Sequence, residues 1–185
     1  TNGMIRPEPL RDLLAVIDAM NIDVKGFTDE FYAKLCRGRL GPVLETVKAV
    51  KAAGCHVELT NLLIPTLNDK DEQVERLVRW VAEEIGEETP LHFSRYHPAY
   101  ELDLPPTPLE TLEKAYRTGK RHLRYVYVGN VWHVDGSDTF CYKCGRRVIE
   151  RRGFDVVAYR IRGDKCEWCG ATLDIVASPG WMEIE

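Results

Sequence analysis

The sequence predicts an α/β fold in which about four βα units form part of a (β/α) TIM-type barrel, followed by a small zinc-ribbon or rubredoxin-like β tail. Strand-like runs begin at Ile22, Val57, Leu91 and Val126, at intervals of 34 or 35 residues, and each interval holds one helix-like segment. Strand and helix alternating in this way are typical of parallel βαβ units. Two CxxC motifs near the C-terminus predict the tail.

Composition limits the class of protein. The 185 residues are 44% hydrophobic and 29% charged, and the formal net charge is -4. A mildly acidic chain does not favour nucleic acid as a partner. No apolar run reaches the roughly 18 residues that span a bilayer, so we expect a cytoplasmic protein without membrane contact. The change of pattern along the chain predicts two domains, 1–136 and 137–185.

The helices follow from helical spacing of apolar residues. They are predicted over residues 7–20, 41–54 and 68–86, with a fourth that begins at Pro108. Asn68 is the expected N-cap of the third, and Thr107 with Glu110 forms the expected capping box of the fourth. The strands lie in the apolar runs 21–27, 56–65, 90–97 and 125–130.

Each predicted strand ends in polar residues. They are Asp23 and Lys25, then Thr60 and Asn61, then Ser94, Arg95, Tyr96 and His97, and finally Asn130. Because the carboxyl ends of parallel strands meet at one edge, these side chains predict a shared pocket there. Within it, His97 is a candidate ligand contact.

Asp23 and Lys25 admit two interpretations. Alternation along a strand puts them on one face and Ile22 and Val24 on the other. They are either ligand contacts or an ordinary ion pair at the edge of a loop. Glu58 could also face inward, but the sequence offers no partner for it.

Four βα units are half of an eightfold barrel, which leaves an inner face and a sheet edge uncovered. We therefore expect a missing N-terminal half of the barrel, supplied by residues before Thr1 or by a second chain.

The tail predicts a metal site. Cys141, Cys144, Cys166 and Cys169 form two CxxC motifs, each closed by a glycine, and residues 146–165 between them read as a hairpin. Four thiolates predict a structural zinc site, with iron of the rubredoxin type as an alternative and a thiol redox pair as another. The many basic residues here either offset the thiolate charge or contact phosphates. Cys36 and Cys55 are expected to be inert thiols.

The order of motifs resembles a known family. TNG at residues 1–3, NIDVKGF at 21–27, VELTNLLIPTLND at 57–69 and HFSRYHP at 92–98 resemble the second half of radical S-adenosylmethionine enzymes of the pyruvate formate-lyase activating type. YVYVGNV followed by the two-knuckle tail resembles the subfamily named for the AmmeMemoRadiSam system.

The resemblance implies a barrel in which a [4Fe-4S] cluster cleaves S-adenosylmethionine to a 5'-deoxyadenosyl radical that abstracts hydrogen from a substrate. It implies that Lys25 meets the methionyl carboxylate, that Thr1 and Asp23 help to hold a monovalent cation, and that His97 lies by the cofactor. Thr60 stands where the family has an arginine, and Asn61 is the expected substitute. The sequence does not identify the substrate: a protein of the glycyl-radical or AmmeMemo type and a small molecule both stay open.

The family's cluster motif, CxxxCxxC, is absent from the sequence. We therefore expect the chain to be the C-terminal part of such an enzyme and to be inactive alone. The alternatives are a zinc-ribbon binding module on an α/β support and a catalytically silent scaffold. The binding module would act as a partner of another protein or as a nucleic-acid adaptor, the latter through Arg146 and Arg151.

Overall fold

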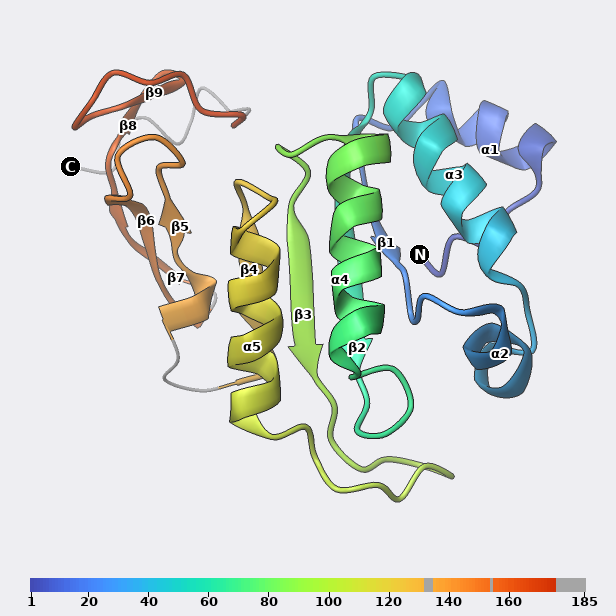
Figure 1. The fold of residues 1–185 in the computed structure, drawn as a ribbon. Helices are drawn as coiled ribbons and strands as arrows, with labels where there is room; N and C mark the ends of the chain where they lie inside the picture. Colours follow the sequence, from blue (N-terminus) through green and yellow to red (C-terminus); the bar gives the residue numbers. More distant parts are fainter. Residues whose placement is uncertain (132–134, 154, 176–185) are drawn as a thin grey trace. The chain divides into compact units, whose positions relative to one another are not determined.

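The computed structural model describes residues 1–131, 135–153 and 155–175, and the chain divides into two compact units after Val131. The first unit is built around a parallel sheet in which the strands follow one another in chain order. The strands are β1 (Ala19–Asp23), β2 (His56–Leu63), β3 (Leu91–Arg95) and β4 (Val126–Gly129). The predicted α/β class is confirmed (Figure 1).

A helical segment lies in each interval between consecutive strands, as parallel pairing requires. These segments are α2 (Asp29–Phe31) with the π-helix η1 (Tyr32–Cys36), α3 (Leu40–Ala52), α4 (Asp71–Trp80) with the π-helix η2 (Val81–Ile85), and α5 (Leu109–Lys120). A further helix, α1 (Pro7–Leu14), precedes β1. No helix within the described part of the chain is long and apolar enough to cross a membrane.

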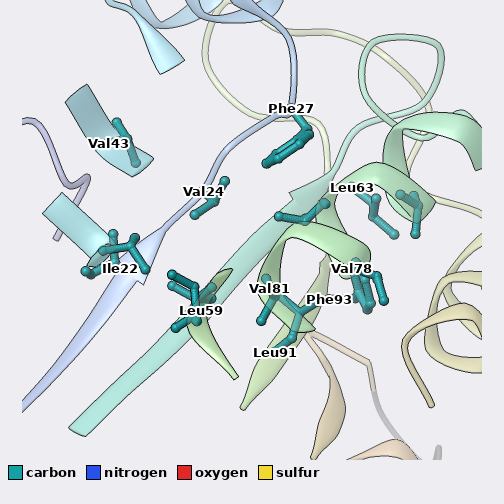
Figure 2. Close-up of a cluster of buried hydrophobic side chains, with 14 of the residues drawn as sticks. Ile22, Val24, Phe27, Val43, Leu59, Leu63, Val78, Val81, Leu91 and Phe93 are labelled. Carbon is teal, nitrogen blue, oxygen red and sulfur yellow. The ribbon is translucent and has the colours of Figure 1, made fainter. Parts of the chain in front are cut away.

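One face of the sheet is buried and the other is not. Side chains on the buried face of β2 and β3, such as Leu59 and Phe93, pack beside Val78 and Val81 from α4 and η2 (Figure 2). Along β2, buried residues alternate with more exposed ones over the whole strand. Parallel sheets are usually covered on both faces, so the polar, partly exposed face is the unusual feature of this unit.

The first helix is shorter than predicted. It ends at Leu14 instead of Met20, and Ala19 and Met20 belong to β1, where they pair with His56 and Val57. The apolar spacing of this segment fits a helix, but the hydrogen bonds available from β2 favour a strand.

Both predicted helix caps are wrong. The residue before α4 is Lys70 and the residue before α5 is Pro108, and neither provides a side-chain cap. Asn68 and Thr107 are instead buried, with relative exposures of 3% and 0%. Their polar atoms bind the carboxyl ends of the strands, where unpaired backbone groups would otherwise be buried.

Asn68 joins the end of β2 to the loop after β1. Its Oδ1 accepts from the Ile64 amide (2.6 Å), and its Nδ2 donates to the carbonyls of Leu62 (2.8 Å) and Lys25 (2.7 Å). The side chain of Asn61 donates to the Val24 carbonyl (2.7 Å). The two asparagines thus hold the backbone carbonyls of Val24 and Lys25 in place.

Thr107 joins β2 to β3, and Asn130 joins β3 to β4. The Thr107 hydroxyl donates to the Leu63 carbonyl (2.6 Å) and accepts from the Tyr96 amide (2.8 Å). Asn130 Nδ2 donates to the Arg95 carbonyl (3.2 Å). We call Asn61, Asn68, Thr107 and Asn130 the strand-end network, because they tie neighbouring strands together at the carboxyl edge of the sheet.

The second unit is a small β structure. Its elements are the 3-10 turn η3 (Asp135–Ser137) and the strands β5 (Thr139–Phe140), β6 (Arg147–Arg152), β7 (Asp155–Tyr159), β8 (Ile161–Arg162) and β9 (Lys165–Cys166). β6 and β7 pair antiparallel, which is the hairpin predicted between the CxxC motifs. Val148, Ile161 and Leu173 are buried beside Cys141 and Cys166 in a core of its own.

Thr107→Val replaces the hydroxyl by a methyl group of similar size and leaves the Leu63 carbonyl and the Tyr96 amide without their side-chain partner. We expect a loss of about 2 kcal/mol in the free energy of unfolding, measured by urea titration. Thr107→Ser keeps the hydroxyl and is the matched control, with a smaller loss. Equal stability of the valine variant and the wild type would contradict the structural role of the network.

Candidate functional site and metal centre

The four tail cysteines converge. Their Sγ atoms all lie within 4.8 Å of one another, with 3.7 Å between Cys141 and Cys169 and 3.8 Å between Cys144 and Cys166. A tetrahedral ion with metal–sulfur bonds of about 2.3 Å requires sulfurs about 3.8 Å apart. The group could therefore hold a metal ion, and the ligand set is compatible with zinc and with iron.

The surroundings of the two buried cysteines of this group act in opposite directions: burial raises the pKa of the Cys141 thiol to about 11, whereas the pKa of the Cys166 thiol is lowered. Gly145 and Gly170 both have a φ of 69°, and their amides donate to the carbonyls of Cys141 and Cys166. Burial acts to raise the pKa of the Cys166 thiol, but hydrogen bonds from the amides of Cys169 and Trp168 outweigh it and lower that pKa to about 7. Metal binding requires deprotonated thiols, so these amides favour the ligand form of Cys166.

At the carboxyl end of β1, Asp23 and Lys25 form an ion pair, with 3.0 Å between Oδ2 and Nζ. Ile22 and Val24 point to the opposite face and are fully buried, as strand alternation predicts. The Lys25 amide donates to the hydroxyl of Tyr32 (3.1 Å). This bond holds the backbone of Lys25 in place. The side chains of Asp23 and Lys25 have exposures of 38% and 43%, so the ion pair itself is open to solvent.

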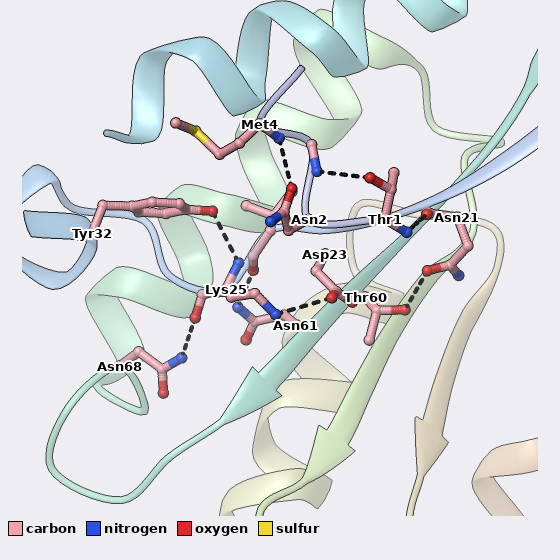
Figure 3. Close-up of polar contacts among 12 residues, drawn as sticks. Thr1, Asn2, Met4, Asn21, Asp23, Lys25, Tyr32, Thr60, Asn61 and Asn68 are labelled. Carbon is pink, nitrogen blue, oxygen red and sulfur yellow. Dashed lines mark hydrogen bonds and ion pairs between the residues drawn. The ribbon is translucent and has the colours of Figure 1, made fainter. Parts of the chain in front are cut away.

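Thr1 and Thr60 lie beside this pair (Figure 3). The amino group of Thr1 donates to the Asn21 carbonyl (2.9 Å), and the Asp23 amide donates to the Thr1 carbonyl (2.8 Å). These two bonds are the pattern of a residue in a parallel strand opposite Ile22. Thr60 faces Asp23 in the sheet register, and its hydroxyl donates to Asn21 Oδ1 (3.0 Å).

The other two predicted contacts lie apart from this cluster. Asn61 is buried on the face opposite to Thr60, and its amide group is engaged by the Val24 carbonyl. His97 follows β3, two strands from β1, and its Nε2 lies 3.3 Å from the Asn130 carbonyl oxygen. The structure therefore brings together Thr1, Asp23, Lys25 and Thr60, without Asn61 or His97.

Glu58 has partners that the sequence did not reveal. Its carboxylate binds His92 Nε2 (3.0 Å) and His56 Nε2 (3.4 Å), and the His92 ring stacks on Tyr127 with 4.9 Å between centroids. The hydrogen bond with His92, against the opposing effect of burial, lowers the pKa of Glu58 to about 2. Glu58 and His92 lie on neighbouring strands and are 34 residues apart. The regular spacing of about 34 residues between strands was the one sequence signal that could have paired these two residues.

One of the two arginines expected to contact nucleic acid, Arg151, is partly engaged within the tail. Arg151 donates to the Ser137 carbonyl (2.8 Å) and the Thr139 hydroxyl (2.9 Å), so this guanidinium is engaged within the tail.

Comparison with solved structures defines the fold. The chain is similar to a domain of the pyruvate-formate lyase-activating enzyme from Bacteroides vulgatus, with a TM-score of 0.59 and 15% identity over 68% of this chain and 75% of that one. It is also similar to a radical SAM methyltransferase from Sphaerobacter thermophilus, with a TM-score of 0.53 and 17% identity over 75% of this chain and 41% of that one. The fold is thus one found in radical SAM proteins.

Comparison by sequence identifies a particular relative. A protein of Methanocaldococcus jannaschii with the name "Uncharacterized protein MJ0808" is 47% identical over 180 residues, which are 95% of this chain and 53% of that protein. The chain spans about half the length of this curated relative. No protein-family model matches the chain.

Glu58→Gln removes the carboxylate that His56 and His92 share. Because the pKa is lower in the folded chain than its ordinary value of 4.5, the unfolded chain takes up the proton first as pH falls. The wild type should therefore exceed the variant in stability by about 1 kcal/mol at pH 7, after allowance for solvent screening. This advantage should disappear between pH 4.5 and about 2.

Urea unfolding at a series of pH values measures the difference. Glu110→Gln is the control, since this exposed carboxylate has no ion pair among the described residues. A Glu58→Gln difference that does not change with pH would contradict the assigned cause.

Cys166→Ser removes one of the four thiols. Since the energy of a structural metal is folding energy, we expect bound metal to fall well below one equivalent and the tail to lose its ordered hairpin. Metal content by mass spectrometry and near-UV circular dichroism measure both effects. Cys36→Ser, which changes a solitary thiol in the first unit, should leave metal content unchanged; equal metal in the two variants would refute the assignment.

Proposed function

We propose that the chain is the C-terminal part of a radical S-adenosylmethionine enzyme of the activating type, within the AmmeMemoRadiSam subfamily. The main support is the cluster of Thr1, Asp23, Lys25 and Thr60 at the carboxyl edge of a sheet whose fold is found in radical SAM proteins. The relative from Methanocaldococcus jannaschii is about twice as long as this chain, which supports the part of the proposal that the chain belongs to a longer protein.

Lys25 is the proposed contact for the methionyl carboxylate. An ammonium group has three donors, and the structure gives Asp23 one of them, so donors remain for an anionic ligand. Asp23 holds the ammonium at the edge of the sheet, and the backbone of Lys25 is held by Tyr32 and Asn68. Thr60 and the Thr1 carbonyl contribute neutral oxygens on the same side, which suits the proposed monovalent cation.

The chemistry itself is supplied by the cofactors: a [4Fe-4S] cluster and S-adenosylmethionine provide the 5'-deoxyadenosyl radical that takes hydrogen from a substrate. The sequence holds no CxxxCxxC motif for this cluster, so we propose that the chain by itself does not catalyse the reaction. For the tail we propose a structural zinc ion, and for the substrate a protein of the glycyl-radical or AmmeMemo type.

The open face of the sheet supports a location for the substrate. On it the register aligns Asp23, Thr60, His92 and Tyr127 across the four strands. All four side chains are partly exposed, so a ligand beside Lys25 has a polar surface next to it. Polar groups converging beside a charged one are typical of ligand sites.

The test uses the protein translated from the longest reading frame in which this chain lies. We expect that frame to place a predicted strand and CxxxCxxC upstream of Thr1, and the reconstituted protein to cleave S-adenosylmethionine. Lys25→Ala should weaken cofactor binding about tenfold by calorimetry, the size of one charge-assisted contact. Lys34→Ala, which removes a lysine paired with Glu30 on an exposed helix surface, should bind normally.

Two results would oppose the proposal. A stop codon directly upstream of Thr1 would make the four-unit chain the native product and would favour the adaptor or scaffold alternatives. Equal affinity of the Lys25→Ala and Lys34→Ala proteins would remove Lys25 from the site.

A further inference from the structure

The second unit carries a groove beside the cysteine centre, with a volume of about 480 Å³. It is formed by residues of β6 and β7 and by the second CxxC turn. The lining residues are Arg146, Arg147, Val148, Glu150, Ala158, Arg160 and Trp168.

Trp168 forms an ordered aromatic wall of this groove. Its Nε1 donates to the Arg147 carbonyl (3.4 Å), and the Arg146 guanidinium lies over its ring, 5.2 Å from the centroid. The side chain is nevertheless 47% exposed. A large ring held in place but left partly open to solvent offers apolar contact area at low entropic cost.

The arginines of the groove differ in the number and closeness of the carboxylates that they contact. Arg147 is paired with Asp138 (2.9 Å) and Glu150 (3.3 Å). Among the residues that the structure describes, the one carboxylate near Arg160 is that of Glu167, at 4.0 Å, and it binds Arg162 more closely, at 3.0 Å.

Arg146 has no carboxylate partner among the residues that the structure describes. Two guanidinium groups on the groove, those of Arg146 and Arg160, therefore have donors available for an anion.

We propose that this groove binds the side-chain carboxylate of an acidic segment in a partner protein, with an apolar neighbour of that carboxylate lying against Trp168. The planar guanidinium groups suit a carboxylate, and Trp168 with Ala158 suits an adjacent apolar side chain. This inference is independent of the proposed enzymatic function.

A nucleic acid fits the groove less well. The volume suits one or two amino-acid side chains, whereas tracking single-stranded nucleic acid requires a groove for several nucleotides.

The test measures fluorescence anisotropy of labelled probes with the metal-loaded chain. One probe is a twelve-residue peptide of alternating glutamate and leucine, and its matched control has glutamine in place of glutamate. A twelve-nucleotide oligothymidylate is the third probe. We expect the glutamate peptide to bind at least about tenfold more tightly than the glutamine peptide, because its carboxylates are the recognised groups.

Arg146→Gln should weaken binding of the glutamate peptide about tenfold. Arg152→Gln, which changes an exposed arginine at the end of β6 outside the groove, is the matched control and should bind as the wild type does. Metal content, measured in both variants, shows that the tail is intact. Equal binding of the two peptides, equal effects of the two substitutions, or tighter binding of the oligothymidylate would each overturn the proposal.

Discussion

Buried hydrogen bonds at the carboxyl ends of the strands are the constraint on which the first unit depends. A parallel sheet leaves strand-end carbonyls and amides without ladder partners, and burial without partners costs about 1 to 3 kcal/mol for each group. The buried members of the strand-end network, Asn61, Asn68 and Thr107, satisfy such groups with side chains that bind the backbone of a neighbouring strand or of the loop that follows it. Asn68 alone satisfies three backbone groups, on Ile64, Leu62 and Lys25. The same bonds that complete the sheet therefore determine where Lys25 is held.

The two faces of the sheet have different roles. The apolar face, with Ile22, Leu59 and Phe93, supplies the burial that stabilises the unit. The other face is free to carry charged and polar groups, and Glu58 with its two histidines shows that it does. An ion pair such as Asp23–Lys25 contributes little to stability at this exposure, so the fold does not depend on it.

The sequence predicted the strands well because their apolar runs are strong and evenly spaced, and it predicted the cysteine cluster because ligand spacing is local. The predictions were wrong where a polar residue before a helix can either cap that helix or bind a backbone group elsewhere. Asn68 and Thr107 precede helices and look like caps, but nearby buried carbonyls are better acceptors for them. Asn61 could have been assigned correctly, since it shares the parity of Leu59 and Leu63 in β2 and so belongs to the buried face.

His92, the closer partner of Glu58, was beyond local reasoning, because it is 34 residues away and only the register of β2 and β3 makes the two neighbours. His56, two residues before Glu58 in β2, could have been paired with it from strand alternation. Thr107 has one more consequence. The Thr107 hydroxyl accepts from the Tyr96 amide, and the Thr107 amide donates to the Tyr96 carbonyl. These two hydrogen bonds hold together the ends of the loop formed by the ten residues between Tyr96 and Thr107. Lengthening such a closed loop costs little, about 0.6 kcal/mol for each doubling. Insertions and deletions there can change the surface beside the carboxyl edge over evolutionary time, while the strands keep their places.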